Sequence, residues 1–399
     1  MTRRVCFIRQ SFVYPGGEAS VRREVETLAR AGFEAHIICL NRQRGDKLAP
    51  EEVIDGIHVY RIPVVRKKTG LTRYVYEYLL FFLLAASKVT RLHLKHPFDA
   101  IQVNTMPDFL VFASLIPKVL RSKVVLMMHE PVPELWETLY GSRPPRILER
   151  VEQAALGYAD AVLTVTQQLK DTYVSRGADP GKISVILNVP EERFLLQRNP
   201  SPKPSSNNGH FTLICHGAVE KRYGHHTMLN AIELVKSQIP GVRLRVLGNG
   251  SYAEGFASEI AQRGLKEHIQ YLGFVPIPVM LQELHAADAG IVAQESSPYS
   301  NLVHTNKMYE YIALGKPVLA TRLKSVSAYF GDDAIGYFEP GNPESLAAAI
   351  SDLVQHPEKR RLRAENARGL YDRYRWEKQR EIYLSVYRQL LEPEEIRRS

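Results

Sequence analysis

Residues 304–321 read HTNKMYEYIALGKPVLAT, and this stretch decides most of what the sequence says about the fold. Its apolar side chains recur at helical spacing, which predicts a helix with Glu310 beside the buried stripe. Gly315 ends that helix, and Pro317 prevents it from continuing. Residues 318–320 then predict a short buried strand. Since α/β proteins hold phosphate at helix N-termini beside strand ends, the stretch predicts such a site.

Strand-like and helical segments alternate along the whole chain, which is typical of parallel α/β architecture. Residues 198–209 are rich in Pro, Ser and Asn and contain no apolar side chain, so they predict a linker. Before the linker we expect strands at 5–10, 35–40, 58–62, 100–104, 124–129, 161–166 and 183–188. After it we expect strands at 211–216, 243–248, 269–273, 289–293 and 318–321.

This pattern predicts two Rossmann-like domains with doubly wound parallel sheets, at 1–197 and 210–370, which face each other across a central cleft. The remaining residues, 371–399, are helical and have no strand of their own. They must therefore pack on a domain that is already formed.

Composition excludes several classes of protein. The chain has 399 residues and a net charge of +9, and residues 1–200 hold 28 basic and 21 acidic side chains. A basic first half suits an anionic partner, but no zinc finger or aromatic RNA-binding signature is present, so we expect no nucleic acid.

The longest apolar run, 79–86, is too short for a membrane span, and the N-terminus predicts a strand rather than a signal peptide. We expect a cytoplasmic protein, peripheral at the inner face of the membrane, whose three single cysteines are buried and reduced.

Two features of the first half are candidates for chemistry. Gly16 and Gly17 lie between the first strand and an amphipathic helix, where backbone can approach a ligand closely. A plain strand-to-helix turn is the alternative. His129 follows a buried strand, at the sheet edge where open α/β proteins place polar groups. The alternative for His129 is a side chain bonded to loop carbonyls.

Three loops of the second half follow strands in the same way. Gly217 precedes Lys221 and Arg222, which place positive charge where a leaving phosphate needs it. A solvated charge pair is the alternative. Gly248 and Asn249 belong to a second Gly-rich turn, and residues 295–301 form a polar, Ser-rich loop.

Taken together, these motifs resemble the family 4 (group 1) retaining glycosyltransferases, which have the GT-B architecture. The matching segments are the Gly16-Gly17 loop, His129, the 217–224 loop, 246–250, 271–273 and 309–318. The resemblance spans nearly the whole chain and is stronger in the second half.

The resemblance implies a nucleotide-sugar donor that binds mainly to the second domain, with retention of anomeric configuration and no bound metal or other cofactor. Glu310 then takes the ribose hydroxyls, and His129 reaches the donor sugar. Backbone amides at Val303, His304 and Thr305 hold the diphosphate, with Gly17 nearby. The donor set is completed by Gly16, Gly217, Gly248, Asn249, Asn301 and Lys307. The last helices, 371–399, are expected to cross back onto the first domain.

This sequence departs from the family pattern at two places. A glutamate is usual eight positions before Glu310, where this chain has Leu302. Either Asn301, Lys307 or Glu295 takes over its contact with the donor sugar, or the sugar selected is a different one. The basic residues usual around the loop glycines are replaced by Ala218 and Tyr223. We therefore assign the phosphate role to Arg222, with Lys221 second.

Residues 61–84 predict the acceptor side. Five basic residues without an intervening acid precede an aromatic, apolar helix start: Arg61, Arg66, Lys67, Lys68 and Arg73. This pattern is typical of contact with an anionic membrane, where a lipid-linked acceptor would be found. A buried helix after a solvated basic loop is the alternative.

The sequence thus predicts a hexosyltransferase that serves a glycan or lipid-linked acceptor in cell-surface polysaccharide or glycolipid biosynthesis. Two alternatives stay open. One is a nucleotide-sugar 2-epimerase of the same architecture, and the other is a non-catalytic nucleotide-sugar-binding protein.

Overall fold

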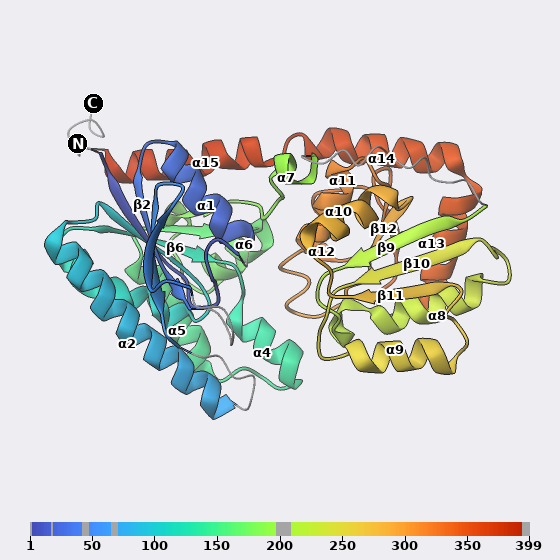
Figure 1. Ribbon diagram of the computed structural model, residues 1–399, viewed down its shortest axis with the longest axis horizontal. Helices are drawn as coiled ribbons and strands as arrows, with labels where there is room; N and C mark the ends of the chain where they lie inside the picture. The colour runs from blue at the N-terminus through green and yellow to red at the C-terminus, as the bar shows by residue number, and fades with distance from the viewer. Residues whose placement is uncertain (1, 17–18, 42–47, 65–70, 197–208, 393–399) are drawn as a thin grey trace. The chain divides into compact units, whose positions relative to one another are not determined.

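The computed structural model describes residues 2–16, 19–41, 48–64, 71–196 and 209–392 (Figure 1). The chain divides into two compact units, each with a sheet of its own. Unit 1 comprises Met1–Leu187 and Glu377–Ser399, and unit 2 comprises Asn188–Trp376. Among the helices in these ranges, none is long and apolar enough to cross a membrane.

Unit 1 contains an eight-stranded sheet in the order β3-β4-β2-β1-β5-β6-β7-β8. Its strands are parallel except that β3 runs antiparallel to β4. They are β1 (Arg4–Ile8), β2 (Glu34–Leu40), β3 (Glu51–Ile54), β4 (Ile57–Ile62), β5 (Ala100–Asn104), β6 (Lys123–Met128), β7 (Ala161–Thr164) and β8 (Ile183–Val185). The inner strands are buried on both faces, as parallel sheets covered by helices require.

The helices of unit 1 connect these strands. They are α1 (Ala19–Arg30), α2 (Leu71–Lys95), η1 (Asp108–Ser114), α3 (Leu115–Val119), α4 (Val132–Tyr140), α5 (Arg146–Tyr158), α6 (Gln167–Ser175) and η2 (Pro180–Lys182). In α1, for example, Val21, Val25 and Leu28 recur at helical spacing and are fully buried. The C-terminal helix α15 (Trp376–Leu391) belongs to unit 1 from Glu377 onward.

Unit 2 contains a six-stranded parallel sheet in the order β11-β10-β9-β12-β13-β14. Its strands are β9 (Phe211–His216), β10 (Val242–Leu247), β11 (Ile269–Gly273), β12 (Ala289–Val292), β13 (Val318–Thr321) and β14 (Gly336–Phe338). Its helices are α7 (Glu192–Leu196), η3 (Lys221–Tyr223), α8 (His225–Val235), α9 (Ala253–Gln262), α10 (Ile277–Ala286), α11 (Asn306–Ala313), α12 (Lys324–Ser327), α13 (Pro343–Gln355) and α14 (Pro357–Tyr371). The predicted helix-turn-strand at 304–321 is therefore α11 followed by β13.

Two strands have no counterpart among the sequence expectations. β3 has the sequence EEVI and alternates between exposed and half-buried residues at the sheet edge, so it has no buried face to detect. β14 is three residues long, too short to show a period. Both lie at the outside of their sheets, where pairing depends on the neighbouring strand rather than on local pattern.

The units also divide at positions other than the expected domain ends. The predicted linker, 198–209, lies outside the described residues except for Gly209. Helix α7 precedes that linker but belongs to unit 2, where Arg368 forms an ion pair with Glu192 (N–O distance 2.9 Å). The three cysteines, Cys6, Cys39 and Cys215, are buried and unpaired with one another.

Candidate functional site

Glu310 of α11 forms an ion pair with His216, the last residue of β9. The distance between Glu310 Oε2 and His216 Nε2 is 2.5 Å, and the Glu310 side chain is 20% exposed. Burial alone would raise the pKa of this carboxyl, but His216 and then Lys307 lower it below its ordinary value. Glu310 is therefore an ionised carboxylate at the strand-end edge of the unit 2 sheet.

His216 is fixed from its other side by Tyr311. The Tyr311 hydroxyl lies 2.9 Å from His216 Nδ1, and the two rings pack edge to face. Because the Glu310 carboxylate can only accept a hydrogen bond, Nε2 of His216 carries a proton and donates it to Glu310. His216 was absent from the site residues predicted from sequence. Its position at the end of the first strand of unit 2 was the signal that could have identified it.

Lys307 lies beside Gly217, in the loop that follows β9. A Cβ atom built on Gly217 would lie 3.5 Å from Lys307 Nζ, and Gly217 has a φ of +109°. Lys307 Nζ also lies 5.1 Å from the centre of the Tyr223 ring. The structure thus brings Lys307, Gly217 and Glu310 together at one edge of the sheet.

The other two predicted cations are placed differently. The Arg222 guanidinium lies 5.0 Å from the centre of the Tyr223 ring, on which Lys307 also packs. Arg222 Nε is buried without a hydrogen-bond partner among the described residues. Lys221 is exposed, and its Nζ lies 5.6 Å from the Tyr252 ring. Arg222 and Lys307 thus both pack on the ring of Tyr223, which stands where the family has a lysine. We call these two cations, Arg222 and Lys307, the Tyr223 cation pair.

Gly248 and Asn249 connect two loops of unit 2. A Cβ on Gly248 would lie 1.7 Å from the carbonyl oxygen of Gly217, and φ at Gly248 is +128°. The Asn249 carbonyl accepts a hydrogen bond from the Val219 amide at 3.1 Å. Glycine is thus required at position 248 because the loop after β9 packs directly against its backbone.

Of the three residues that could replace the missing glutamate, only Lys307 lies beside Glu310 and Gly217. Asn301 Nδ2 donates to Ser296 Oγ (3.1 Å) and to the Ser297 carbonyl (3.0 Å), and its Oδ1 accepts from the Lys324 amide (3.0 Å). Glu295 accepts from Thr227 Oγ1 at 2.9 Å. Asn301 and Glu295 therefore brace the polar loop.

Val303, His304 and Thr305 lead into α11, and Thr305 is its N-cap residue in extended conformation. The His304 ring is buried, with Nδ1 3.2 Å from the Ser325 carbonyl and Nε2 3.0 Å from the Tyr309 hydroxyl. Burial lowers the pKa of His304 to about 4, so the ring is neutral and holds the loop in place. Because the first amides of a helix have no intrahelical partner, this N-terminus offers donors to an anion.

In unit 1, His129 follows β6 and is 4% exposed. Its Nε2 lies 3.3 Å from Asn104 Nδ2, and its backbone amide donates to Thr105 Oγ1 at 3.3 Å. Gly16 is exposed in the loop after β1, and Gly17 lies outside the described residues.

The prediction of a basic surface at 61–84 is wrong for Arg61. The Arg61 guanidinium is buried, donates to the Ala49 and Tyr14 carbonyls at 2.7 Å each, and pairs with Glu52. The alternation of β4 points this side chain inward, so it cannot contact a membrane. Arg73 pairs with Glu77 of the same helix, and residues 66–68 lie outside the described residues.

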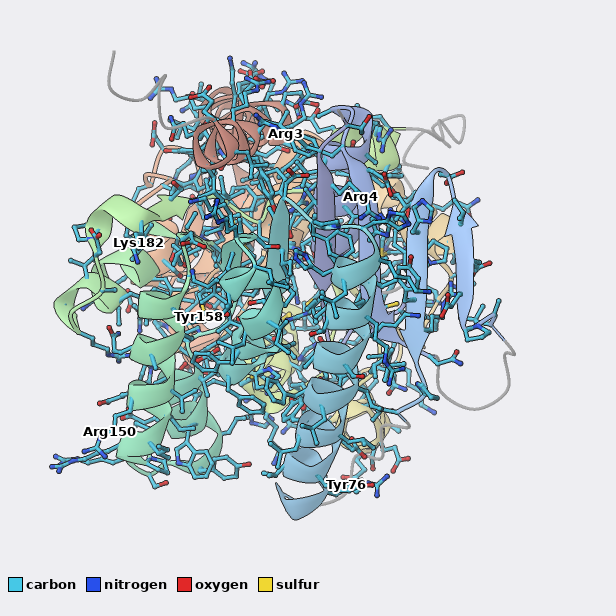
Figure 2. The ribbon with its side chains drawn as sticks, turned by 90° about the vertical axis from the view of Figure 1, so that its left-hand side faces the viewer. Arg3, Arg4, Tyr76, Arg150, Tyr158 and Lys182 are labelled. Atoms are coloured by element: carbon cyan, nitrogen blue, oxygen red, sulfur yellow. The ribbon has the colours of Figure 1, made fainter. Side chains whose placement is uncertain are left out.

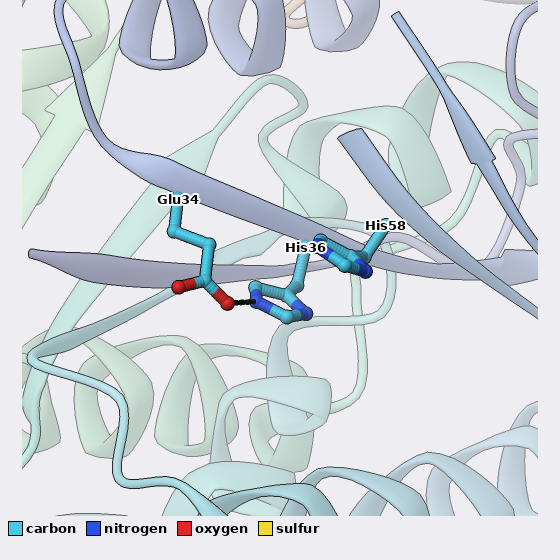
Figure 3. Close-up of side chains that lie close together, drawn as sticks. All are labelled: Glu34, His36 and His58. Carbon is cyan, nitrogen blue, oxygen red and sulfur yellow. Dashed lines mark hydrogen bonds and ion pairs between the residues drawn. The ribbon is translucent and has the colours of Figure 1, made fainter. Parts of the chain in front are cut away.

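A group of metal-ligating residues also occurs in unit 1. Glu34 and His36 of β2 lie beside His58 of β4, within reach of one another (Figure 3). The two imidazole rings stack with centroids 4.5 Å apart and planes 11° apart, so their lone pairs run parallel instead of meeting at one point. Arg4 already pairs with Glu34 (Nε–Oε1 distance 2.9 Å) and contacts His36. This geometry is that of an arginine-anchored histidine stack, and it does not fit a metal centre.

Comparison with known families accounts for both units. Residues 15–188 match the "Glycosyl transferase 4-like domain", and residues 197–370 match "Glycosyl transferases group 1". A D-inositol 3-phosphate glycosyltransferase of Corynebacterium urealyticum is 26% identical over 187 residues, 44% of this chain and 42% of that relative. The match thus spans less than half of that relative's length. An uncharacterised glycosyltransferase of Methanocaldococcus jannaschii is 20% identical over 382 residues, 92% of each chain.

Solved structures share the fold over nearly the full length. Sucrose-phosphate synthase from Thermosynechococcus elongatus superposes with a TM-score of 0.77 at 18% identity, covering 97% of this chain and 99% of that one. HepE from Anabaena, solved in complex with UDP-glucose, gives a TM-score of 0.72 at 17% identity with the same coverage. These neighbours are glycosyltransferase folds of the GT-B type. With both family models matched in order along one chain, the chain belongs to the group 1 glycosyltransferases of family 4.

Proposed function

We propose that this glycosyltransferase moves a hexosyl unit from a nucleotide sugar to a glycan or lipid-linked acceptor, with retention of configuration and without a bound metal. The observation that carries the proposal is the Glu310 carboxylate, held by His216 beside Lys307 and Gly217 at the edge of the unit 2 sheet. HepE, a structural neighbour, binds UDP-glucose, which supports a donor of this class.

In this proposal unit 2 binds the nucleotide. Glu310 accepts hydrogen bonds from the ribose hydroxyls, because an ionised carboxylate fixed by His216 is a strong acceptor. The diphosphate lies at the N-terminus of α11, where unpaired amides and the Lys307 ammonium face it.

The leaving diphosphate gains negative charge as the bond between its oxygen and the anomeric carbon of the sugar breaks and the bond to the acceptor oxygen forms. The Tyr223 cation pair, Arg222 and Lys307, supplies the compensating positive charge. We assign the main role to Lys307, because its Nζ lies beside Gly217 whereas Lys221 is exposed. The contact of His129 with the donor sugar stays a prediction from the family resemblance.

Product analysis with UDP-glucose tests this function. Proton NMR should show that wild-type protein slowly releases glucose from the donor, and that the sugar first appears in the α configuration of the donor. Epimerised UDP-sugar as the product would instead support the 2-epimerase alternative. Binding without any turnover, with several sugar acceptors present, would support a non-catalytic nucleotide-sugar-binding protein.

We further propose that unit 1 meets its acceptor at an anionic membrane surface. Helix α2 exposes a row of apolar side chains at helical spacing, and the neighbouring α3 adds more. The exposed residues are Val75, Tyr76, Leu79, Leu83, Leu115, Ile116, Val119 and Leu120. Apolar side chains on adjacent helices give a face that can enter a lipid headgroup layer.

The segment 139–150, which comprises the end of α4, the loop after it and the start of α5, supplies the positive charge that residues 61–73 were expected to provide. It exposes three arginines among apolar side chains, and Glu149 is its only acid. The exposed residues are Leu139, Tyr140, Arg143, Arg146, Ile147 and Arg150. Tyr76 of α2 and Arg150 of α5 lie at the same end of unit 1 (Figure 2). Arginine beside tyrosine and leucine suits an anionic interface.

A further inference from the structure

A buried hydrogen-bond network in unit 1 connects the C-terminal helix to His129. Gln102 and Asn104 are two positions apart in β5, so their side chains lie on the same face of the strand, and both are fully buried. Glu24 of α1 is 2% exposed. Tyr383 and Tyr387, one turn apart on α15, are also fully buried. Because such groups are costly to bury unless they are paired, the donors and acceptors of this network must match throughout.

Glu24 determines the direction of these hydrogen bonds. Its Oε2 accepts from Gln102 Nε2 at 2.7 Å and from Asn104 Nδ2 at 2.8 Å. A carboxylate can only accept, so both amide groups must turn their NH₂ toward it. If the amide of Asn104 were turned over, its oxygen would face the carboxylate and its nitrogen would face the Gln102 donor.

The remaining bonds follow from this orientation. Gln102 Nε2 donates its second hydrogen to Asn104 Oδ1 at 3.0 Å. Gln102 Oε1 accepts from the hydroxyls of Tyr383 at 2.7 Å and Tyr387 at 2.6 Å. Asn104 has one NH₂ hydrogen left, and Nε2 of His129 lies 3.3 Å from that nitrogen. Nε2 must therefore accept, which leaves the imidazole proton on Nδ1.

We propose that Glu24 and Asn104 are positioning residues that hold His129 in its Nδ1–H tautomer. A histidine that contacts a donor sugar must present the correct nitrogen as donor, and this network fixes which one it is. The catalytic meaning of the tautomer rests on the proposed function, whereas the tautomer itself does not. Tyr383 and Tyr387 satisfy the far end of the network without setting its direction.

Nitrogen NMR of histidine-labelled, full-length protein tests the tautomer without any substrate. The His129 signals are assigned by their loss in His129→Gln. We expect wild-type protein to show the proton on Nδ1 alone. A proton on Nε2, or averaging between the two tautomers, overturns the proposal.

Two isosteric variants test which residues set the tautomer. Asn104→Asp replaces the donor with an oxygen, so the proton should move to Nε2 of His129. Glu24→Gln removes the acceptor-only group, so both tautomers should become populated. An unchanged Nδ1–H pattern in both variants overturns the assignment of Glu24 and Asn104.

The double variant Tyr383→Phe/Tyr387→Phe is the matched control for simple loss of buried hydrogen bonds. It should lower the melting temperature but leave His129 as the Nδ1–H tautomer. A shift of the tautomer in this variant would overturn the role assigned to Glu24, because the hydroxyls would then set the direction.

Kinetics with UDP-glucose then connect the tautomer to activity. We expect Glu24→Gln to lower kcat about 10- to 100-fold with a donor KM within about threefold of wild type, as misoriented catalytic groups commonly do. An unchanged kcat despite a changed tautomer overturns the positioning role. A wild-type protein with the Nδ1–H tautomer but no turnover would instead contradict the proposed function.

Discussion

At the scale of single residues, the Glu310–His216 pair is the centre of the proposed donor site. His216 donates to Glu310 and is in hydrogen-bond contact with the Tyr311 hydroxyl on its other side, so the carboxylate has one preferred orientation. The low pKa of Glu310 follows from this partner and from Lys307, which together outweigh the effect of burial. A carboxylate of this kind stays charged throughout the neutral pH range.

Glu310→Gln should weaken UDP binding about 10- to 100-fold, because a hydrogen bond to a charged group contributes roughly 1.5–3 kcal/mol. Calorimetric titration with UDP measures the change. Glu295→Gln is the matched control, since Glu295 bonds to Thr227 in the polar loop. Equal affinity in wild type and Glu310→Gln would remove Glu310 from the nucleotide site.

Lys307→Met and Lys221→Met separate the two lysines that could face the diphosphate. Lys307 lies beside Gly217, so its loss should weaken UDP binding about 10-fold or more and reduce the dependence of binding on salt. Lys221 is exposed, and its loss should change the affinity by less than about twofold. Titrations at two salt concentrations measure both effects. The opposite ranking would favour Lys221 over Lys307 as the lysine that contacts the diphosphate.

Asp108→Asn should stabilise the protein increasingly as pH rises from 5 to 8. Asp108 is 4% exposed, its Oδ1 has no hydrogen-bond partner among the described residues, and burial followed by repulsion from Glu152 raises its pKa to about 8. The unfolded chain loses this proton near its ordinary pKa of 3.8. Between those values the unfolded state releases a proton that the folded state retains, so wild-type stability falls as pH rises.

Melting temperatures of wild type and Asp108→Asn across that pH range measure the effect, which should reach at least about 2 kcal/mol at pH 8. Asp171→Asn, on the exposed side of α6, is the control. A constant difference between Asp108→Asn and wild type at every pH would contradict the raised pKa.

At the scale of elements, the strand-to-helix loops of unit 2 depend on backbone packing. The loop after β10 packs against the loop after β9 at Gly248, where no side chain fits. This contact places the Gly217 loop beside Lys307, so packing and the proposed chemistry depend on the same glycine.

Gly248→Ala should destabilise the protein by more than about 4 kcal/mol, since its Cβ would overlap the Gly217 carbonyl and its φ is positive. Denaturant unfolding measures the loss. Gly264→Ala is the control, because Gly264 has a φ of +64° but no atom within 4 Å of its Cβ, and it should cost about 1 kcal/mol. Similar losses in both variants would show that the contact between the loops is not required.

The exposed face of α2 should bind vesicles that contain anionic lipid. Flotation should recover wild-type protein with anionic vesicles and leave it behind with neutral ones, because the arginines of 139–150 require negative headgroups. Tyr76→Ser/Leu83→Ser should lose at least about 10-fold in binding, since these side chains are 54% and 62% exposed. Phe274→Ser, an 81% exposed residue of unit 2, is the control. Equal, negligible recovery with both kinds of vesicle would rule out this surface.

At the scale of the whole molecule, two α/β units and their strand positions could be predicted from the sequence. Apolar runs of four to seven residues, separated by helical periods, identify parallel strands that are buried on both faces. Edge strands such as β3 lack this pattern, and α7 is too short to reveal its partner. Its place in unit 2 depends on Arg368, which is 176 residues further along the chain.

The candidate site, like the fold, could be predicted from the sequence only in part. Helical period placed Glu310 beside the buried stripe of its helix, and family motifs identified the loop glycines. The direction of side chains in irregular loops carries no period. Asn301 and Glu295 were therefore equal candidates with Lys307 until the structure turned them toward loop partners. The basic cluster at 61–73 also suggested an exposed Arg61, but this residue lies on β4 and its side chain is buried.

Local order along the chain is enough to establish the α/β class and the position of Glu310, because each depends on periods and turns within about twenty residues. The family resemblance depends on the order of several such motifs along the chain. Partnerships across the chain needed the folded molecule. His216 meets Glu310 over 94 residues, and Tyr387 meets Gln102 over 285. Such contacts form only where strand ends converge at one sheet edge or where a helix closes over a buried face. Hydrogen-bond direction, which sets the tautomer of His129, is therefore a property of tertiary structure.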